Sequence, residues 1–548
     1  MRALRLLAPA LAVVSFTAMM AAIFVPDLNP FPDPAGVVAT FNPGGDIDGS
    51  GAFFQSLGTN GRTCASCHRI DQAMSLSSAG VQAIYRQSRG TDPVFAVIDG
   101  ANCPTDDGAK RASHSLLLNR GLIRVGLTLP NNREFSISVV HDPYGCAITH
   151  DANTGADIIS VYRRPLPTTN LRFLSAVMFD GRNTIQPLTS ASTFPANLEA
   201  DLKQQALEAT LGHAQAATKP TAAQLDEIVS FEMDLHTAQM FGRGAGMLNN
   251  HGAAGGPMAL AKQPYYPGIN DTLGADPAGT GFNPSSMKLF STWNPENGPG
   301  SYYLEDGSQM RARIAAGEKL FNTAAATIND VRGLNDDPAL GSPAVIKGTC
   351  TTCHDTPNVG NHSMPLPLDI GTSRQAAFES NPDIVAGLGN LTPPDLPIYE
   401  ISGCPDSASP STKVTFYTSD PGKALISGNC SDVNRGKGPI LRGLAARAPY
   451  VHNGAAANLQ QLVDFYDKRF QMDLTPEQKE DMIFFKTLCD AYRLRSNNLL
   501  HAPRANRRTR ARGARPSSPP RWGCSTRCRW RPRRCSSSPP IPRPRAAI

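Results

Sequence analysis

The sequence predicts a mainly α-helical fold of two domains joined by long loops, with a small β insertion in the first domain. The chain has 548 residues, which is more than one hydrophobic core usually organises. It contains 47 glycines and 46 prolines, so long loops should connect modest amounts of regular structure. Hydrophobic residues make up 41% and charged residues 18% of the chain, as in ordinary globular proteins and unlike disordered or fibrous ones.

The first 25 residues have the pattern of a signal peptide. Two arginines lie within Met1–Arg5, and the following stretch Leu6–Val25 has no charged residue. This apolar stretch is long for a cleaved signal, and no small-residue cleavage site closes it before Pro26. An uncleaved N-terminal membrane anchor is therefore the alternative. In both cases we expect the bulk of the chain to be exported.

The rest of the chain divides by composition. The predicted segments are a lead-in over residues 26–50, a first domain over 51–245, a linker over 246–310, a second domain over 311–490 and a basic tail over 491–548. Alternating polarity over Glu134–Val140 and the β-prone run Ile158–Tyr162 predict the β insertion. Capping boxes at Thr221–Gln224 and Thr475–Gln478 predict the starts of two helices.

The tail accounts for the positive charge of the chain. Residues 501–548 contain 14 arginines but no lysine and no acidic residue, so the preceding residues carry a net charge of −8 although the whole chain carries +6. Because the excess charge is confined to one end, we expect no nucleic-acid partner. We interpret the tail as the product of a reading-frame change near Cys489, with a disordered tail as the alternative.

Two short motifs carry the chemistry. Cys64–His68 reads Cys-Ala-Ser-Cys-His, and Cys350–His354 reads Cys-Thr-Thr-Cys-His. Two thiols at this spacing can form thioethers with the two vinyl groups of one haem, and the adjacent histidine then ligates the iron. A zinc site made of four cysteines, or a redox cysteine pair, would leave both histidines unexplained. We therefore predict two covalent haem c groups in two cytochrome c-like domains. The predicted attachment residues and proximal ligands are Cys64, Cys67, His68, Cys350, Cys353 and His354.

Four other cysteines are candidates for disulfides. Cys103 and Cys146 flank the β insertion, and Cys404 and Cys430 flank a polar loop of the second domain. An oxidising compartment favours both pairs. The sequence leaves the pairing open, because four cysteines allow three connectivities.

Two longer stretches add to the haem motifs. Met178–Arg182 reads Met-Phe-Asp-Gly-Arg, and Ala448–Gly454 reads Ala-Pro-Tyr-Val-His-Asn-Gly. They resemble the Phe-Trp-Asp-Gly-Arg and Ala-Pro-Tyr-x-His-Asn/Asp-Gly segments of the bacterial di-haem cytochrome c peroxidase superfamily, which includes the MauG-type enzymes. The resemblance runs from about Gly51 to Leu488. In the family the tryptophan bridges the two haems, and Phe179 takes its place here.

The resemblance implies a loop beside a peroxide-binding haem, with a glutamine and, further on, a catalytic glutamate. Gln205 matches the glutamine, and Gln215 stands where the glutamate belongs. Glutamine cannot act as a carboxylate base, which weakens peroxidase chemistry of the family type. His213 is the candidate that would transfer protons or ligate iron instead, and the alternative is a solvent-facing histidine at a helix end.

The sixth iron ligands stay open. MauG-type members use a tyrosine near the second haem and peroxidases use a methionine, so Tyr466 resembles the MauG pattern, with a core aromatic residue as the alternative. His362, Met364 and Met74 are further candidates by chemistry, although single methionines more often pack. The resemblance also implies a Ca2+ ion between the domains.

The function implied by the resemblance is that of a periplasmic peroxidase-like oxidoreductase, which would be held at the inner membrane if the first segment is an anchor. One haem would relay electrons from a small redox protein or a quinol-linked donor, and the other would bind peroxide or oxygen. Two alternatives stay open. They are a non-catalytic electron-transfer cytochrome and a MauG-like oxidase of an organic or protein substrate.

Overall fold

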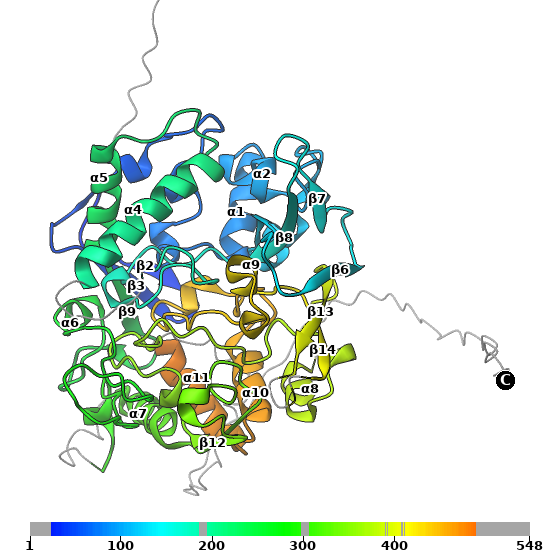
Figure 1. Cartoon of the computed structure of the whole chain (residues 1–548). Coiled ribbons are helices and arrows are strands. Elements are labelled where there is room, and N and C mark those ends of the chain that lie inside the picture. The colour runs from blue at the N-terminus through cyan, green and yellow to red at the C-terminus, as the bar shows by residue number, and fades with distance from the viewer. Residues whose placement is uncertain are drawn as a thin grey trace, which may run out of the picture. The chain divides into compact units, whose positions relative to one another are not determined.

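Helices and short strands occur in successive groups along the part of the chain that the structure describes (Figure 1). This computed structural model describes residues 24–185, 194–296, 306–389, 391, 393–406, 409 and 411–488. The predicted export segment up to residue 23 and the predicted basic tail lie outside these residues. The last two residues of the predicted signal, Phe24 and Val25, form a strand that pairs with Ile47–Asp48.

Two predicted helix starts are confirmed. Thr221 and Gln224 exchange capping hydrogen bonds at the start of α5, and Thr475 and Gln478 do the same at the start of α11. The α-helices are α1 (Ser78–Ser88), α2 (Val97–Gly100), α3 (Ser115–Arg120), α4 (Phe194–Gly212), α5 (Ala222–Asp234), α6 (Pro257–Ala261), α7 (Ser308–Thr323), α8 (Pro382–Leu388), α9 (Ala424–Ser427), α10 (Leu459–Arg469) and α11 (Pro476–Leu488).

The strands form five small sheets with the orders β1-β4, β10-β9-β3-β2, β11-β12, β14-β13-β6 and β5-β8-β7. The strands are β1 (Phe24–Val25), β2 (Phe31–Asp33), β3 (Gly36–Phe41), β4 (Ile47–Asp48), β5 (Ile123–Thr128), β6 (Ser136–His141), β7 (Ile148–His150), β8 (Asp157–Arg163), β9 (His236–Gly242), β10 (Gly246–Met247), β11 (Ala326–Asn329), β12 (Val345–Gly348), β13 (Ile398–Pro405) and β14 (Lys413–Thr418).

The prediction of a mainly α fold is wrong. Helices account for 33% and strands for 17% of the structure, and the strands lie in five sheets. Strands this short contain few alternating positions, so they give little periodic signal in the sequence. The pairing of β3 with β9 illustrates the difficulty, because β3 lies in the predicted lead-in and β9 near the end of the predicted first domain.

Both stretches that were predicted to form the β insertion are strands, but they lie in different sheets. β8 is the central strand of the β5-β8-β7 sheet. β6 pairs instead with β13 of the predicted second domain, with Ile137 opposite Ile401 and Val139 opposite Tyr399 (Figure 1). Strand pairing therefore connects the two predicted domains, and all described residues fall within one compact unit. The division into two haem domains stays a prediction.

The largest hydrophobic cluster lies where α7, α10 and α11 pack together. Residues of the predicted linker take part in it, since Phe290 and Trp293 are fully buried and stack at 4.8 Å. The Phe290 ring also contacts Phe485 of α11 edge-on. Across the described residues, no helix has the length and apolar content that crossing a membrane requires.

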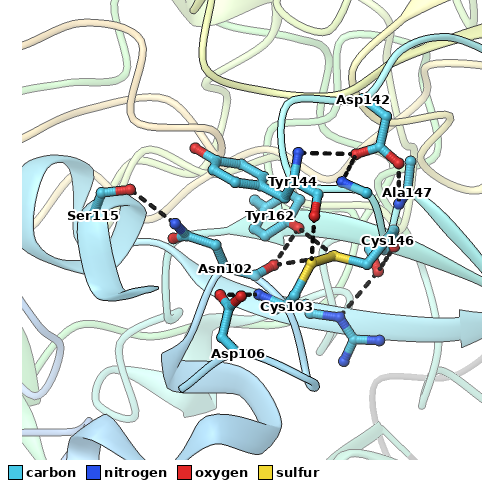
Figure 2. Close-up of a disulfide and its surroundings, with 12 residues drawn as sticks. Asn102, Cys103, Asp106, Ser115, Asp142, Tyr144, Cys146, Ala147 and Tyr162 are labelled. Atoms are coloured by element: carbon cyan, nitrogen blue, oxygen red, sulfur yellow. Dashed lines mark hydrogen bonds between the residues drawn. A yellow bond between two sulfur atoms is a disulfide. The ribbon is translucent and has the colours of Figure 1, made fainter. Parts of the chain in front are cut away.

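Both predicted disulfides are confirmed, as Cys103 bonds to Cys146 and Cys404 to Cys430. Figure 2 shows the first of them beside Tyr162, whose hydroxyl donates to the carbonyl of Asn102. The Asp142 carboxylate accepts hydrogen bonds from the backbone N–H groups of Tyr144, Gly145 and Ala147, on both sides of Cys146. The bonded cysteines are therefore held by neighbouring backbone as well as by the covalent link.

Removing the second disulfide should destabilise the fold. The Cys404–Cys430 bond closes a loop with a sequence separation of 26 and anchors the end of β13. We expect the double substitution Cys404→Ala/Cys430→Ala to lower the free energy of unfolding by about 3 kcal/mol in denaturant titrations. Thr415→Ala, at an exposed position on β14, is the control. Equal stabilities of the double variant and the control would contradict the expectation.

Candidate functional site

The first Cys-x-x-Cys-His motif forms a capped 3-10 turn over Cys64–Ser66. Thr63 and Ser66 exchange capping hydrogen bonds around the turn. The N–H of His68 donates to the carbonyl of Cys64 at 3.0 Å, which brings the histidine back over the turn that carries both cysteines.

The second motif repeats this geometry. Cys350–Thr352 forms a 3-10 turn that is capped by Thr349 and Thr352, and the N–H of His354 donates to the carbonyl of Cys350 at 3.0 Å. A threonine before the first cysteine and a serine or threonine before the second are therefore part of the motif. The sequence shows this extended repeat, although our sequence analysis did not use it.

A backbone carbonyl orients each motif histidine. Nδ1 of His354 lies 2.6 Å from the carbonyl oxygen of Gly360, and Nδ1 of His68 lies 3.4 Å from that of Met74. Gly360 and Met74 both have left-handed backbone conformations, with φ of 72° and 55°. When Nδ1 donates to such a carbonyl, Nε2 is left to ligate a metal. Burial lowers the pKa of both histidines to about 4, so both are neutral at pH 7, as a ligand must be.

The four motif cysteines are free thiols. Burial is the main cause that raises their pKa, to about 12 for Cys64, 11 for Cys67 and 12 for Cys353. Within the described residues, no cluster of three or more metal-ligating side chains includes any of these cysteines.

Both motifs line one cavity of about 880 Å³, a size in the range of cofactor pockets. The motif residues on its wall are Cys64, Cys67, His68, Cys350, Cys353 and His354. The fold thus brings two distant sequence segments, each with two thiols and one neutral imidazole, to a common space.

The charges on the cavity wall fit an anionic group such as a haem propionate. Arg164 donates to the backbone carbonyls of Arg120, Leu76 and Arg447. No ion pair with a carboxylate is present for Arg164 in the described part of the chain. Burial, together with the neighbouring charge of Arg447, lowers the pKa of Arg164 to about 9, so it stays positive at pH 7 and needs a counter-charge. The donor set and the wall charges therefore fit haem c.

The two stretches that carry the family resemblance meet at the cavity. Phe179 and His452 both line it, and their rings stack at 4.5 Å with an interplanar angle of 14°. Arg163 lies over the Phe179 ring and forms a two-point ion pair with Asp420, at 2.7 and 2.9 Å. Arg163 also pairs with Asp180, so two buried carboxylates hold the cation that lies over the Phe179 ring.

Of the predicted distal residues, Gln205 and His213 line the cavity but Gln215 does not. Gln215 is exposed and has a φ of 54°. Nδ1 of His213 is hydrogen-bonded to the Asp99 carboxylate, which also pairs with Arg62. Burial alone would raise the pKa of Asp99, but the bond to His213 and the charge of Arg62 outweigh it and lower the pKa.

The sixth-ligand candidates fall into two groups. Tyr466 and His362 line the cavity, and the Tyr466 ring lies 6.4 Å from that of His354. Met74 and Met364 are not part of the wall. The Met74 side chain is fully buried in a hydrophobic cluster, and the Met74 carbonyl oxygen faces Nδ1 of His68. The methionines that do line the cavity are Met178 and Met472, neither of which was a predicted ligand.

Two other buried ionisable residues on the wall were also missed. Glu232 of α5 is 3% exposed, its Oε2 has no hydrogen-bond partner in the described structure, and burial raises its pKa to about 8. Lys437 donates to the carbonyls of Ala176 and Val177, and burial lowers its pKa to about 7. Glu232 lies on the buried, apolar side of α5 with Ile228 and Val229. A single carboxylate among apolar residues is the sequence feature that could have revealed it.

Comparison with known proteins gives partial matches. Over 122 residues the chain is 33% identical to the cytochrome-c peroxidase IdrP2 of Denitromonas iodatirespirans. The matched region covers 22% of this chain and 29% of that protein. Over 153 residues it is 26% identical to the cytochrome-c peroxidase IdrP1 of Pseudomonas sp. (strain SCT). This region covers 25% of this chain and 36% of that protein. The chain resembles cytochrome-c peroxidases.

These matches support a family like that of the cytochrome-c peroxidases. The chain spans about a third of the length of each relative that it matches. No protein-family model matches the chain, and no solved structure gives a significant match. Neither relative is named as a MauG-type enzyme, so that part of the resemblance stays a prediction.

Glu232 should make stability depend on pH. Its pKa is about 8 when folded and near 4.5 when exposed, so the folded state binds more protons between these values and stability falls as pH rises. We expect Glu232→Gln to remove a slope of up to about 1.4 kcal/mol per pH unit between pH 5 and 8, measured by chemical denaturation. Glu227→Gln, exposed on the same helix, is the control. Identical slopes in wild type and Glu232→Gln would refute the assignment.

Proposed function

We propose that this chain is an exported c-type cytochrome that carries two covalent haems and acts as a peroxidase-like oxidoreductase. The observation that carries the proposal is that both Cys-x-x-Cys-His turns face one cavity. In each turn the thiols are free and the histidine is neutral, with Nδ1 held by a carbonyl. The partial likeness to cytochrome-c peroxidases supports the same reading.

In this proposal, Cys64 and Cys67 hold the first haem and His68 ligates its iron. Cys350, Cys353 and His354 do the same for the second. The bound haems would supply the one-electron steps of peroxide reduction. Arg164 would bind a propionate, and the stacked rings of Phe179 and His452 would pack beside the haems.

The residues of the chain would supply the protons. Reduction of hydrogen peroxide to two waters consumes two protons as well as two electrons. His213 is suited to deliver them, because Asp99 holds its Nδ1 and leaves Nε2 to exchange protons with a ligand in the cavity. Its side chain is 44% exposed, so solvent can reprotonate it. Gln205, which also lines the cavity, would orient peroxide by hydrogen bonding.

A non-catalytic electron-transfer cytochrome is the second candidate. Tyr466, Met178 and Met472 lie on the cavity wall, and each offers an atom that can ligate iron. If such residues closed the sixth position of both irons, peroxide could not bind. The state of the sixth position therefore separates the two functions.

The number and state of the haems test the proposal. Untruncated protein exported by a host that matures c-type cytochromes should show a Soret band and a mass increase of two porphyrins. The number of bound haems should fall to one in the double variant Cys64→Ser/Cys67→Ser and also in Cys350→Ser/Cys353→Ser. The control variant Ala65→Ser should keep both haems. A high-spin ferric signal with cyanide or peroxide binding supports the peroxidase. Two low-spin haems that ignore peroxide would show an electron carrier, and a protein without porphyrin would refute the proposal.

His213 is open to a separate test. We expect His213→Ala to lower kcat for peroxide reduction by roughly 100- to 10,000-fold, because general acid–base groups contribute on this order. Haem content and the reduction potentials should stay as in wild type. His141→Ala, exposed on β6 and outside the cavity, is the control. Unchanged turnover in His213→Ala would remove this residue from the mechanism.

A further inference from the structure

Three buried side chains meet beside the second motif. Asp271 lies in the loop after α6, Asp355 directly follows the motif histidine, and His362 lies on the loop that the motif begins. One ligand atom from each lies within 4.8 Å of the others, and the two aspartates are 0% and the histidine 3% exposed. We call these three residues the Asp-Asp-His cluster.

Backbone groups hold one oxygen of each carboxylate. Oδ2 of Asp271 accepts hydrogen bonds from the N–H groups of Leu273 and Ala275, at 3.1 and 2.8 Å. Oδ1 of Asp355 accepts one from the N–H of Ser363 at 2.7 Å. The other oxygens, Oδ1 of Asp271 and Oδ2 of Asp355, are buried and have no hydrogen-bond partner in the described structure. Each carboxylate is thus oriented, with one free oxygen.

The imidazole shows the same arrangement. Nδ1 of His362 lies 3.2 Å from the carbonyl oxygen and 3.1 Å from the N–H of Met364, so Met364 contacts this nitrogen in either tautomer. When Nδ1 donates to the carbonyl, Nε2 carries no proton and can ligate a metal ion. Nε2 is buried, has no hydrogen-bond partner in the described structure, and lies 3.6 Å from Oδ2 of Asp355. That distance is too long for a hydrogen bond but suits two ligands of one ion. A held Nδ1 and a free Nε2 are typical of a metal-binding histidine.

No positively charged side chain compensates the cluster in the described part of the chain. Two carboxylates are buried here, and among the described residues no lysine or arginine forms an ion pair with either of them. Burying such charges without compensation is costly. We propose that the Asp-Asp-His cluster binds a divalent transition-metal ion such as Zn2+. An imidazole nitrogen with two carboxylates suits such an ion better than Ca2+, which takes oxygen ligands.

The ion would stabilise the loop that orients His354. Asp355 and His362 lie on either side of Gly360, whose carbonyl faces Nδ1 of His354. Joining them through one ion to Asp271 would fix this loop against the chain after α6. The three residues are therefore positioning residues for the motif. The metal assignment itself does not depend on the proposed peroxidase function.

Metal content and binding test the proposal. Untagged, exported wild-type protein should contain one equivalent of non-haem metal by mass spectrometry, or should take up one equivalent of Zn2+ by calorimetry after chelator treatment. Zn2+ should also raise its unfolding temperature. Asp271→Asn should weaken binding by more than the roughly 10- to 100-fold typical for loss of an outer-shell contact. Asp276→Asn, buried in the same loop outside the cluster, should bind as wild type does.

Several results would overturn the proposal. Wild-type protein that carries no extra metal and takes up no Zn2+ would show that the cluster is not a metal site. Wild-type affinity in Asp271→Asn would also contradict it. If Asp271→Asn does not fold, the Zn2+ affinity of His362→Gln and the metal content of wild type test the proposal in its place. None of these readouts uses turnover, so they are independent of whether the chain reduces peroxide.

Discussion

The structure depends on holding two neutral histidines in fixed orientations next to free thiol pairs. A short capped turn places each histidine over its cysteines, and the carbonyl of Met74 or Gly360 sets the ring. Both carbonyls come from left-handed residues, so the chain must turn sharply after each motif. Burial then keeps the rings uncharged. These local features leave Nε2 of each motif histidine able to ligate a metal ion, and they come from the protein chain alone.

Buried charge organises the space around these turns. Arg163 forms ion pairs with Asp180 and Asp420 and lies over the ring that stacks on His452. Burial alone would lower the pKa of Arg163, but the two carboxylates outweigh it and raise the pKa. Because removing one member would leave an uncompensated buried charge, the network favours a single arrangement of the cavity wall. It joins β8 to segments far along the chain.

The second motif has an additional layer of support. The loop after it returns through Gly360 to His362, and the Asp-Asp-His cluster lies at its base. In the first motif, the carbonyl that faces the histidine belongs to Met74, whose side chain packs in a hydrophobic cluster. The two sites therefore share their local geometry but differ in what holds it. If both carry the proposed haem, this difference is one way for the two irons to differ in potential or in the ease of opening the sixth position.

The sequence by itself determined the local chemistry. The spacing of Cys64–His68 and Cys350–His354 and the capping boxes of α5 and α11 depend on near neighbours, so short patterns predict them. The sequence also contains the four cysteines that form disulfides, but only the structure decided how they pair. Only the tertiary structure decided that both motifs share a cavity, that β6 pairs with β13, and that Glu232 and Met472, rather than Gln215 and Met74, reach the wall. These outcomes arise from contacts between distant segments, whose positions no local periodicity specifies.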